Sequence, residues 1–374
     1  MPVLRTRDRA PGKSPGSRMT HLNYPIEVKP GSLQNLGEFV TRVAPTHRYA
    51  IITDSNVGPL YGRVAHEALG IDPNDVLAIP SGENSKTRGS WGWITDQLIE
   101  RGFGRDSAIV ALGGGVIGDL AGFVAATYMR GIPIIQVPTT LLAMIDASIG
   151  GKTGVDTQAG KNLVGAFHPP SGVLVDPQLL ATLPLRELRT GFAEALKHGA
   201  IANRGYFDSV VSAIPRVLYG RGESGDSLTG VIVGSIEIKS GIVARDEHEG
   251  GVRKILNFGH TVGHAIEMLS GYSLAHGEAV AIGMTLESKI AERAGIAAEG
   301  ICREIKGALT AAGLPVDMPD GMDADRILEV MRADKKARAG SVRYALPRAI
   351  GEMAGAESGW TVSVAESIVR EVLT

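Results

Sequence analysis

Residues 107–119 read Ser107-Ala-Ile-Val-Ala-Leu-Gly-Gly-Gly-Val-Ile-Gly-Asp119, and this stretch decides the fold. An apolar run ends in three glycines and a helical pattern follows, which is the order of a buried strand, a tight turn and a helix. Similar apolar runs, separated by helical patterns, occupy residues 48–54, 76–79, 132–137 and 173–175. Continuous apolar strands that alternate with helices predict an α/β fold with a parallel sheet covered on both faces.

The character of the sequence changes after Pro184, where long helical patterns replace the short strands. These patterns cover residues 185–203, 227–243, 257–269, 278–294 and 297–312. We therefore predict an N-terminal Rossmann-like parallel-sheet domain at residues 19–183 and an all-helical C-terminal domain at residues 184–374. The cleft between two such domains is the default place for a ligand site.

Composition excludes several classes of protein. The 374 residues carry a formal net charge of −2, which gives no electrostatic reason to expect nucleic acid or a membrane as a partner. No apolar run is long enough to cross a bilayer, and the single Cys302 cannot form an internal disulfide, which fits a reducing cytoplasm.

The first eighteen residues are basic and contain three prolines. Because no apolar core of a secretory signal follows, we expect residues 1–18 to be a disordered tail, with Met19 as an alternative true start. An organelle transit peptide is a less favoured interpretation of the same composition.

A metal site is the strongest chemical hypothesis from the residues alone. His260 and His264 are four residues apart and so share a helix face, and His276 follows nearby, although the chain has only nine histidines. Three imidazoles suit a divalent ion, whereas the alternative is a helix that merely carries two polar histidines. Glu194, three residues before Lys197, is either half of a surface ion pair or a carboxylate ligand beside the histidines.

The glycine turn suggests a ligand that carries phosphate. Residues 113–118 lie where backbone can approach a pyrophosphate at a helix N-terminus, although a tight strand–helix turn would also explain them. Asp54 ends an earlier strand, where it can accept ribose hydroxyls or cap a turn. Thr139 and Thr140 can bind ligand, but helix capping is the safer interpretation.

Several cations could hold a substrate with two anionic groups. Lys152 and Lys161 follow glycines, which suits compact recognition of phosphate, while a pair of solvated surface lysines is an equal alternative. The helical region adds its own cations, and Asn257 lies close to the histidine motif. These cations are Lys239, Arg253, Lys335 and Lys336.

Several stretches together resemble the 3-dehydroquinate synthase family, and the similarity runs from Tyr24 to about Glu352. Three of them read Gly150-Gly-Lys-Thr-Gly154, Ile255-Leu-Asn-Phe-Gly-His-Thr-Val-Gly-His264 and His276-Gly-Glu-Ala-Val-Ala-Ile-Gly-Met284. The others lie at residues 80–86, 113–123, 128–131, 136–142 and 160–168.

The resemblance implies a cytoplasmic, homodimeric, NAD-dependent metalloenzyme of the shikimate pathway. It would convert 3-deoxy-D-arabino-heptulosonate 7-phosphate to 3-dehydroquinate and phosphate. Residues 19–183 would bind NAD, and residues 184–374 would bind zinc or cobalt and the substrate. The metal ligands would be Glu194, His260 and His276, whereas His264 would contact substrate, which removes one histidine from the three-histidine hypothesis.

The resemblance also assigns the remaining site residues. The positions that match NAD contacts are Asp54, Glu83, Lys86, Gly114, Gly115, Asp119, Thr139, Thr140, Lys152, Lys161 and Thr182. The positions that match the substrate site are Asp146, Lys152, Asn162, Lys197, Lys239, Arg253, Asn257 and His264. Arg130 would reach the phosphate of the neighbouring subunit's substrate, and Lys336 is favoured over Lys335 as a further contact.

Three other functions are weighed against this one. A sister cyclase would act on sedoheptulose 7-phosphate, or on an amino or inosose variant, but Lys239, Arg253 and Asn257 keep the pattern that suits a carboxylate. A metal-dependent polyol or glycerol dehydrogenase would not need the lysine-rich phosphate set. A catalytically inactive scaffold ranks last, because no matching site position is lost.

Overall fold

The computed structural model describes residues 17–19, 21–220, 225–335 and 342–374. Most of the predicted tail therefore lies outside the described residues. Residues Ser17–Met19 form a short strand, β1, which pairs antiparallel with β2 (Ile26–Val28).

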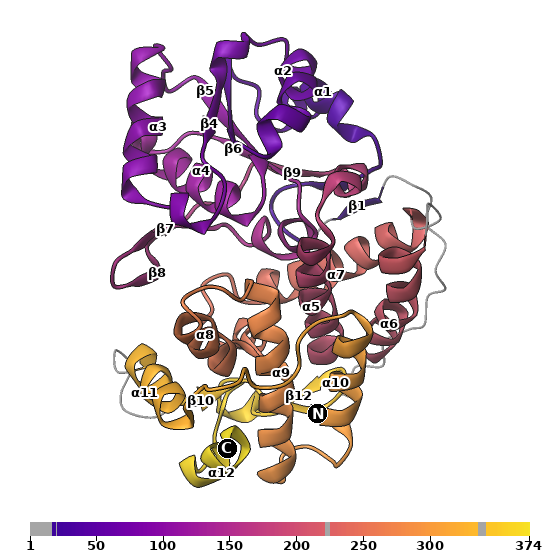
Figure 1. Cartoon of the computed structure of the whole chain (residues 1–374). Helices are drawn as coiled ribbons and strands as arrows, with labels where there is room; N and C mark the ends of the chain where they lie inside the picture. The colour runs from indigo at the N-terminus through magenta and orange to yellow at the C-terminus, as the bar shows by residue number, and fades with distance from the viewer. Residues whose placement is uncertain (1–16, 20, 221–224, 336–341) are drawn as a thin grey trace.

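The N-terminal part is built on the predicted parallel sheet (Figure 1). Its strand order is β1-β2-β9-β6-β5-β3-β4, and every neighbouring pair except β1–β2 is parallel. The remaining strands are β3 (Arg48–Asp54), β4 (Val76–Ile79), β5 (Ser107–Gly113), β6 (Ile134–Pro138) and β9 (Gly172–Val175). The sequence placed the fourth run at residue 132, but β6 begins two residues later, because Pro133 has no N–H to donate to a strand ladder.

Helices cover both faces of this sheet, as continuous apolar strands require. Alternate residues of β5 point to opposite faces, so Val110 packs with α1 (Leu36–Val43) and α2 (Arg63–Leu69). Ile109 packs on the other face with α3 (Arg88–Glu100) and α4 (Gly115–Thr127). The fold class predicted from the sequence is confirmed.

A hairpin projects from the sheet part toward the helices (Figure 1). Strands β7 (Lys152–Thr157) and β8 (Gly160–Phe167) pair antiparallel and carry Lys152, Lys161 and Asn162. The sequence analysis assigned the glycine-flanked lysines of this region to phosphate recognition, but it predicted no strands here.

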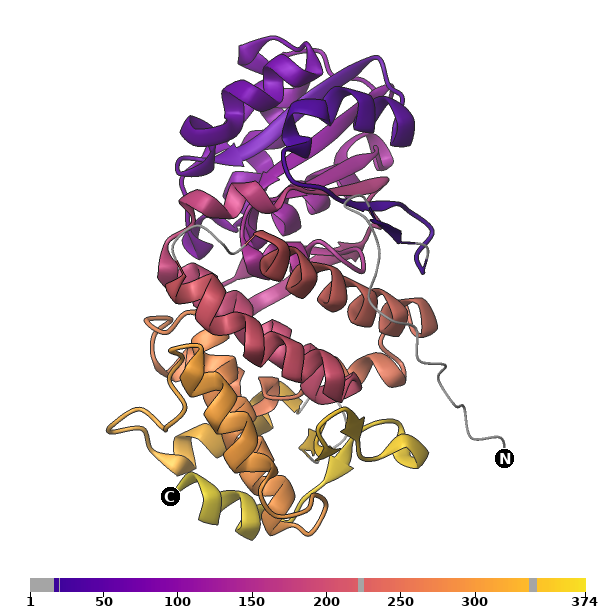
Figure 2. The same cartoon turned by 90° about the vertical axis from the view of Figure 1, so that its right-hand side faces the viewer.

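The C-terminal part is a helical assembly, which Figure 2 shows below the sheet. Its helices are α5 (Leu185–Ala202), α6 (Arg204–Tyr219), α7 (Gly225–Arg245), α8 (His260–Leu269), α9 (His276–Arg293), α10 (Ile301–Ala311), α11 (Ala324–Lys335) and α12 (Glu366–Leu373). Two small ribbons accompany them, in which β10 (Arg343–Tyr344) pairs with β13 (Val362–Ser363) and β11 (Pro347–Ala349) pairs with β12 (Glu352–Met353). The division at residues 183 and 184 remains a prediction, because one apolar cluster continues from α1 through Met144 into Phe192 of α5 and Ile236 of α7.

Helix α7 is long and apolar enough to cross a membrane by length and composition alone, the one such helix in the described ranges. Half of it is buried, and its apolar residues Leu228, Ile232 and Ile236 belong to the core shared with α5 and α6. The burial of these residues explains the apolar composition of α7 as that of a core helix.

Helices α8 and α9 approach each other closely because glycines line their contact. A Cβ at Gly283 of α9 would overlap the carbonyl oxygen of Gly259, which caps α8 in a left-handed conformation with φ 80°. This left-handed cap also explains why α8 begins at His260 and not at residue 257, as predicted from the sequence.

We predict that Gly283→Ala destabilises the protein by about 1–3 kcal/mol, because the new methyl group must push α8 and α9 apart. Denaturant unfolding measures the change. Gly307→Ala is the matched control, because Gly307 lies exposed in α10 with nothing near its Cβ position. A helix interior favours alanine by roughly 0.5–1 kcal/mol, so this control should be neutral or stabilising. Equal losses in both variants would contradict the packing argument.

Candidate active site

The sheet presents a ligand site where its strand order reverses. The chain passes from β3 outward to β4 and then returns to β5 on the other side of β3. In open parallel sheets, ligands bind outside the carboxyl ends of the strands at such a point. Asp54 ends β3 and Gly113 ends β5, so the structure brings the two predicted nucleotide elements together. Asp54 Oδ1 also accepts the N–H groups of Asn56 and Val57 at 2.8 and 2.9 Å, which is the capping role weighed as its alternative.

The glycine turn leaves the N-terminus of α4 open. Gly114 is the N-cap of α4, and no side chain caps the helix. A Cβ at Gly113 would lie 2.6 Å from Ile117, and one at Gly114 would lie 3.1 Å from Thr140 Cγ2, so larger residues do not fit. Uncapped N–H groups at a helix N-terminus suit a phosphate group.

The two threonines differ in role. Thr140 Oγ1 accepts the N–H of Ala143 at 3.1 Å, which is the expected capping bond. Thr139 Oγ1 is buried and has no hydrogen-bond partner among the described residues. A buried hydroxyl without a partner is costly, so Thr139 is the better candidate for a ligand contact.

A chain of charged groups runs from the glycine turn to the helical part. Lys86 Nζ donates to Asp119 Oδ2 at 2.6 Å and lies 3.7 Å from Glu83 Oε1. Lys161 Nζ lies 3.8 Å from Glu83 Oε1 and donates to Glu267 Oε1 of α8 at 2.9 Å. Burial opposes the charge on Lys86, but its two carboxylates outweigh this effect and raise its pKa. Thr182 does not belong to this series of charged groups, and its Oγ1 is hydrogen-bonded to the Tyr61 hydroxyl at 2.7 Å.

The predicted metal ligands converge on one carboxylate. Glu194 of α5 is fully buried, and neither of its oxygens makes a hydrogen bond with any described residue, although Lys197 forms an ion pair with it. His260 Nε2 lies 3.7 Å from Glu194 Oε1, and His276 Nε2 lies 3.8 Å from the same oxygen. A buried carboxylate between two imidazole nitrogens is the donor set that catalytic zinc sites use.

Hydrogen bonds at the other ring nitrogens orient both histidines. His260 Nδ1 lies 3.1 Å from the carbonyl oxygen of Phe258, and His276 Nδ1 lies 3.5 Å from Glu267 Oε2. Because these acceptors need an N–H at Nδ1, both Nε2 lone pairs face Glu194, as metal ligands do. Burial, with the nearby Lys197 charge, places the pKa of His260 well below its usual range. Burial opposes charge on His276 too, but Glu267 and Glu194 outweigh it and raise its pKa.

His264 also belongs to this group. It lies one turn after His260, is exposed, and its ring centroid lies 5.1 Å from that of His260 and 5.7 Å from that of His276. The nitrogens of the three histidines lie close enough to hold one ion, so the structure brings together both predicted ligand sets. The choice between His264 and Glu194 as third ligand remains a prediction.

A second carboxylate–histidine group includes Asp146, Glu194 and His198. It suits a metal less well, because Asp146 already has a cationic partner and one ring nitrogen of His198 is already hydrogen-bonded. Lys239 Nζ lies 2.7 Å from Asp146 Oδ1, and His198 Nδ1 lies 3.1 Å from Ser235 Oγ. The charge of Lys239 therefore already neutralises Asp146.

One residue that sequence reasoning missed sits among the predicted substrate contacts. Glu249 forms an ion pair with Lys152, and its Oε1 accepts a hydrogen bond from Asn257 Nδ2 at 2.6 Å. Burial opposes its charge, but Lys152 and Asn257 outweigh this and lower its pKa. Arg253 is buried nearby, and its backbone N–H donates to Asp246 Oδ2 at 2.9 Å. Glu249 could be found only from the fold, because nothing in its sequence neighbourhood distinguishes it.

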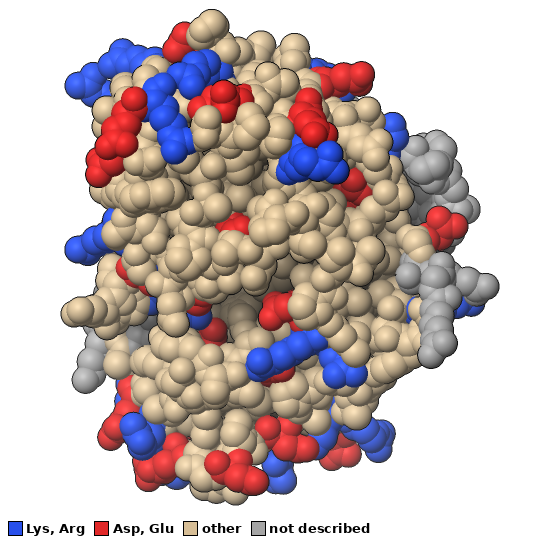
Figure 3. All heavy atoms as spheres, turned by 45° about the horizontal axis from the view of Figure 1, so that its top comes forward, with Lys and Arg blue, Asp and Glu red and all other residues tan. Residues whose placement is uncertain are grey.

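Asn162 and Arg130 are the remaining predicted residues within the described part of the chain. Asn162 adopts φ 55° on β8, and its N–H donates to Asp156 Oδ1 at 2.9 Å. Arg130 lies exposed in a left-handed turn at φ 68°. Lys336 lies outside the described residues, and Lys335 ends α11. The space-filling view shows a hollow on one face, with acidic and basic side chains around it (Figure 3).

Solved structures place this arrangement in a class of enzymes. A 2-deoxy-scyllo-inosose synthase complexed with carbaglucose-6-phosphate, NAD+ and Co2+ matches with a TM-score of 0.86 and 28% identity, over 96% of this chain and 99% of that chain. The 2-epi-5-epi-valiolone synthase of Streptomyces hygroscopicus subsp. jinggangensis 5008, with NAD+ and Zn2+ bound, matches with a TM-score of 0.81 and 29% identity, over 96% and 97% of the two chains. The fold is that of the sugar phosphate cyclases.

Family comparisons narrow the class. Residues 76–190 match the model described as 3-dehydroquinate synthase N-terminal, and residues 191–337 match the one described as 3-dehydroquinate synthase C-terminal. A 3-dehydroquinate synthase of Symbiobacterium thermophilum is 47% identical over 88% of this chain and 92% of its own length. The chain belongs to the 3-dehydroquinate synthase family.

A glutamate of α9 fixes the start of the helix that carries His260. The Glu287 carboxylate is fully buried and accepts the N–H groups of Gly259 at 2.7 Å and Val262 at 3.0 Å. It thereby caps α8 from the helix that begins with His276. Glu292, one turn further along α9, caps α10 in the same way through Gly300 and Cys302.

We predict that Glu287→Gln weakens zinc binding by about 10-fold, because an amide nitrogen must face an N–H and α8 loses its fixed start. Competition with a chromogenic chelator measures the affinity. Glu292→Gln is the same change on the same helix at a cap remote from the histidines, so its zinc affinity should match the wild type. An equal loss of zinc affinity in both variants would contradict the capping argument, because it would show a general effect of altering α9.

We predict that His260→Ala loses bound metal, because it removes a nitrogen that faces Glu194, whereas His264→Ala keeps metal and loses activity. Metal content after dialysis distinguishes the two variants. Equal metal loss in both would reject the set of Glu194, His260 and His276 in favour of three histidines.

Proposed function

We propose that this chain is a lyase that converts 3-deoxy-D-arabino-heptulosonate 7-phosphate to 3-dehydroquinate and inorganic phosphate. The atoms balance as loss of one phosphate, with ring opening and intramolecular aldol closure, and no net oxidation. The observation that carries the proposal is the buried Glu194 carboxylate between two imidazoles, joined by a chain of charges to a nucleotide-type glycine turn.

The chain's own residues fit the cofactors of this reaction. The orphaned oxygens of Glu194, with His260 and His276, would hold Zn2+ or Co2+, and the turn at Gly114 with Thr139 would hold NAD. When bound, NAD would supply a transient oxidation and return the hydride, and the ion would stabilise negative charge on a substrate oxygen.

The cations of the site would bind and orient the two anionic ends of the substrate. Arg253 and Lys239 are buried, and a buried guanidinium beside an ammonium suits a carboxylate. Lys152 and Asn162 stand on the hairpin, where they suit the phosphate. Glu249 forms an ion pair with Lys152, so an incoming anion would have to displace the Glu249 carboxylate.

The nearest alternative is a sister cyclase for sedoheptulose 7-phosphate, because the two similar solved structures are enzymes named for products other than 3-dehydroquinate. That substrate lacks a carboxylate and would leave the buried Arg253 without a substrate anion, whereas Lys239 already pairs with Asp146. A polyol dehydrogenase would accumulate NADH, which the proposed reaction does not.

We also infer a cytoplasmic homodimer. Met129 and Arg130 both hold left-handed backbone angles, which is costly for residues other than glycine and so points to a role for this exposed turn. In the family pattern that arginine acts on the neighbouring subunit's substrate. Sedimentation that gives only a monomer would contradict the inference.

We predict phosphate release from the keto-acid phosphate that requires NAD, stops on chelation of the metal, resumes with Zn2+ or Co2+, and shows no net NADH. A coupled phosphate assay, with absorbance at the NADH band recorded in parallel, measures both. Sedoheptulose 7-phosphate is the parallel substrate. Turnover of that sugar alone would overturn the substrate assignment, and stoichiometric NADH would support a dehydrogenase.

A further inference from the structure

A line of hydrogen-bonding groups leads from the substrate site into the helical part. Asp146 Oδ1 lies 3.3 Å from His198 Nε2, and His198 Nδ1 lies 3.1 Å from Ser235 Oγ. Ser235 Oγ lies 2.7 Å from the Tyr206 hydroxyl, which also lies 2.7 Å from the carbonyl oxygen of Val231. The four side chains come from four separate segments, namely the turn at residues 143–147 and helices α5, α6 and α7.

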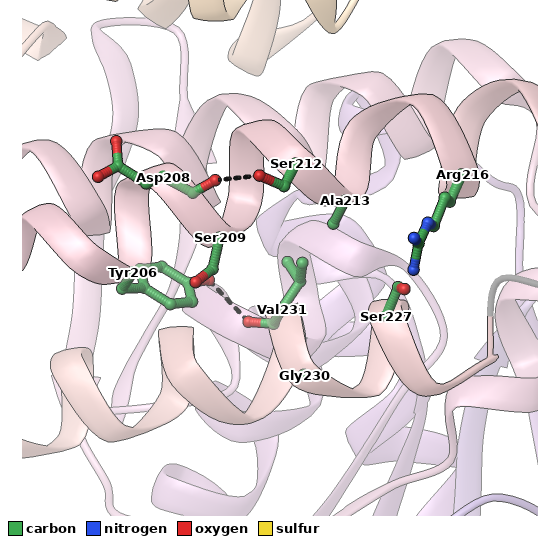
Figure 4. Close-up of a pocket in the computed structure, with 9 residues that line it drawn as sticks. All are labelled: Tyr206, Asp208, Ser209, Ser212, Ala213, Arg216, Ser227, Gly230 and Val231. Carbon is green, nitrogen blue, oxygen red and sulfur yellow. Dashed lines mark hydrogen bonds between the residues drawn. The ribbon is translucent and has the colours of Figure 1, made fainter. Parts of the chain in front are cut away.

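This line is buried at its centre and reaches the surface at its outer end. His198 and Ser235 are fully buried, so their polar atoms depend on each other for hydrogen bonds. Tyr206 lines a groove of about 580 Å³ between α6 and α7, where Figure 4 shows its hydroxyl directed at Val231. The outer end can therefore be altered from the surface without entering the substrate site.

The charge on Asp146 decides which way the protons point along the line. Lys239 Nζ lies 2.7 Å from Asp146 Oδ1 and also donates to the Asp146 carbonyl oxygen at 2.7 Å. Burial opposes the charge on Asp146, but Lys239 and Lys197 outweigh it and hold the pKa of this carboxyl well below its usual range. Burial also lowers the pKa of His198, so its ring is neutral and carries one N–H.

Only one proton order is compatible with an anionic Asp146. If Nδ1 carried the proton, the Nε2 lone pair would face a carboxylate oxygen at 3.3 Å, which is repulsive. If Nε2 carries the proton, its N–H lies beside the Asp146 carboxylate as a favourable electrostatic contact at 3.3 Å, outside hydrogen-bond geometry. Ser235 then donates to His198 Nδ1, and Tyr206 shares its proton between Ser235 and Val231. Every donor in the line then points toward the negative charge.

We propose that His198, held in its Nε2–H tautomer by Ser235 and Tyr206, is a positioning residue that orients the Asp146 carboxylate in the substrate site. The contacts of His198 and Lys239 both fall on Oδ1, so together they fix the position of that oxygen and of the Lys239 ammonium. Asp146 belongs to the sheet part, whereas His198 and Lys239 belong to the helical part. The same contacts therefore also help to position the two parts relative to each other. The effect on turnover rests on the proposed function, whereas the tautomer does not.

Kinetics test the positioning role. His198→Leu removes the donor with a side chain of similar bulk, and we expect kcat/KM to fall by about 10- to 100-fold, as small misplacements of reacting groups do. His198→Gln can place an amide N–H near the position of Nε2, and we expect it to stay within about threefold of the wild type, while both variants bind NAD as the wild type does. A wild-type rate in His198→Leu, or equal losses in both variants, would overturn the proposal.

The surface end supplies a milder variant and a matched control. Tyr206→Phe keeps the ring and removes the outermost donor, and we expect a smaller fall of about two- to fivefold. Ser212→Ala lies in the same groove, but Ser212 donates only to the Asp208 carbonyl oxygen of its own helix, so we expect no change. Equal rates in Tyr206→Phe and Ser212→Ala would remove Tyr206 from the line.

A spectroscopic measurement separates this inference from the proposed function. The 15N shifts of histidine-labelled wild-type protein report the tautomer, and the His198 signal is assigned as the one missing from His198→Gln. We expect Nε2–H; an Nδ1–H ring or an imidazolium would overturn the proposal, whether or not the chain turns over the sugar acid phosphate. If the wild type has no such activity but shows Nε2–H, the proposed function fails and the tautomer assignment stands.

Discussion

A buried negative charge on Glu194 is the constraint on which the rest of the site depends. An ionised carboxylate without hydrogen bonds inside a protein costs several kcal/mol unless cations surround it. Lys197, on the same helix, compensates part of that charge. Nε2 of His260 and Nε2 of His276 lie near the same carboxylate, where a metal cation would compensate the rest. The surrounding packing keeps these groups in register, because glycines bring α8 and α9 together and Glu287 ties the start of one to the body of the other.

The two parts of the molecule are joined by charge as well as by apolar packing. The series of Asp119, Lys86, Glu83, Lys161, Glu267 and His276 runs from the glycine turn to the proposed metal ligands. Opposite charges alternate along it from Asp119 to Glu267, so each of these groups stabilises the ionised form of its neighbours, and Glu267 then accepts from the His276 ring. The hairpin carrying Lys161 is the bridge in this series, which gives the projecting strands β7 and β8 a purpose in shaping the site.

The same principle operates around Asp146, where cations and a neutral histidine hold a carboxylate from the other part of the chain. Cyclases named for other products share this fold, so substrate choice depends on the side chains of the site and not on the fold. In the proposed function, Arg253, Lys239 and Lys152 would distinguish a doubly anionic sugar acid from a sugar with one phosphate. Arg253 and Lys239 are buried, and Lys152 pairs with Glu249, so surrounding contacts already orient all three side chains.

The parallel sheet, the glycine turn, the helical second part and the histidine cluster could be predicted from the sequence, because hydrophobic periodicity, glycine spacing and the i, i+4 rule are local properties of the chain. It did not predict the hairpin at residues 152–167, since much of β8 is exposed and lacks an apolar strand pattern. Glu249, Glu287 and His198 were also missed. Their roles come from partners 8 to 97, 25 to 28 and 37 to 52 residues away in the chain. Only the tertiary structure decided these roles, because the charge, burial and direction of each group are set by segments that the fold brings together.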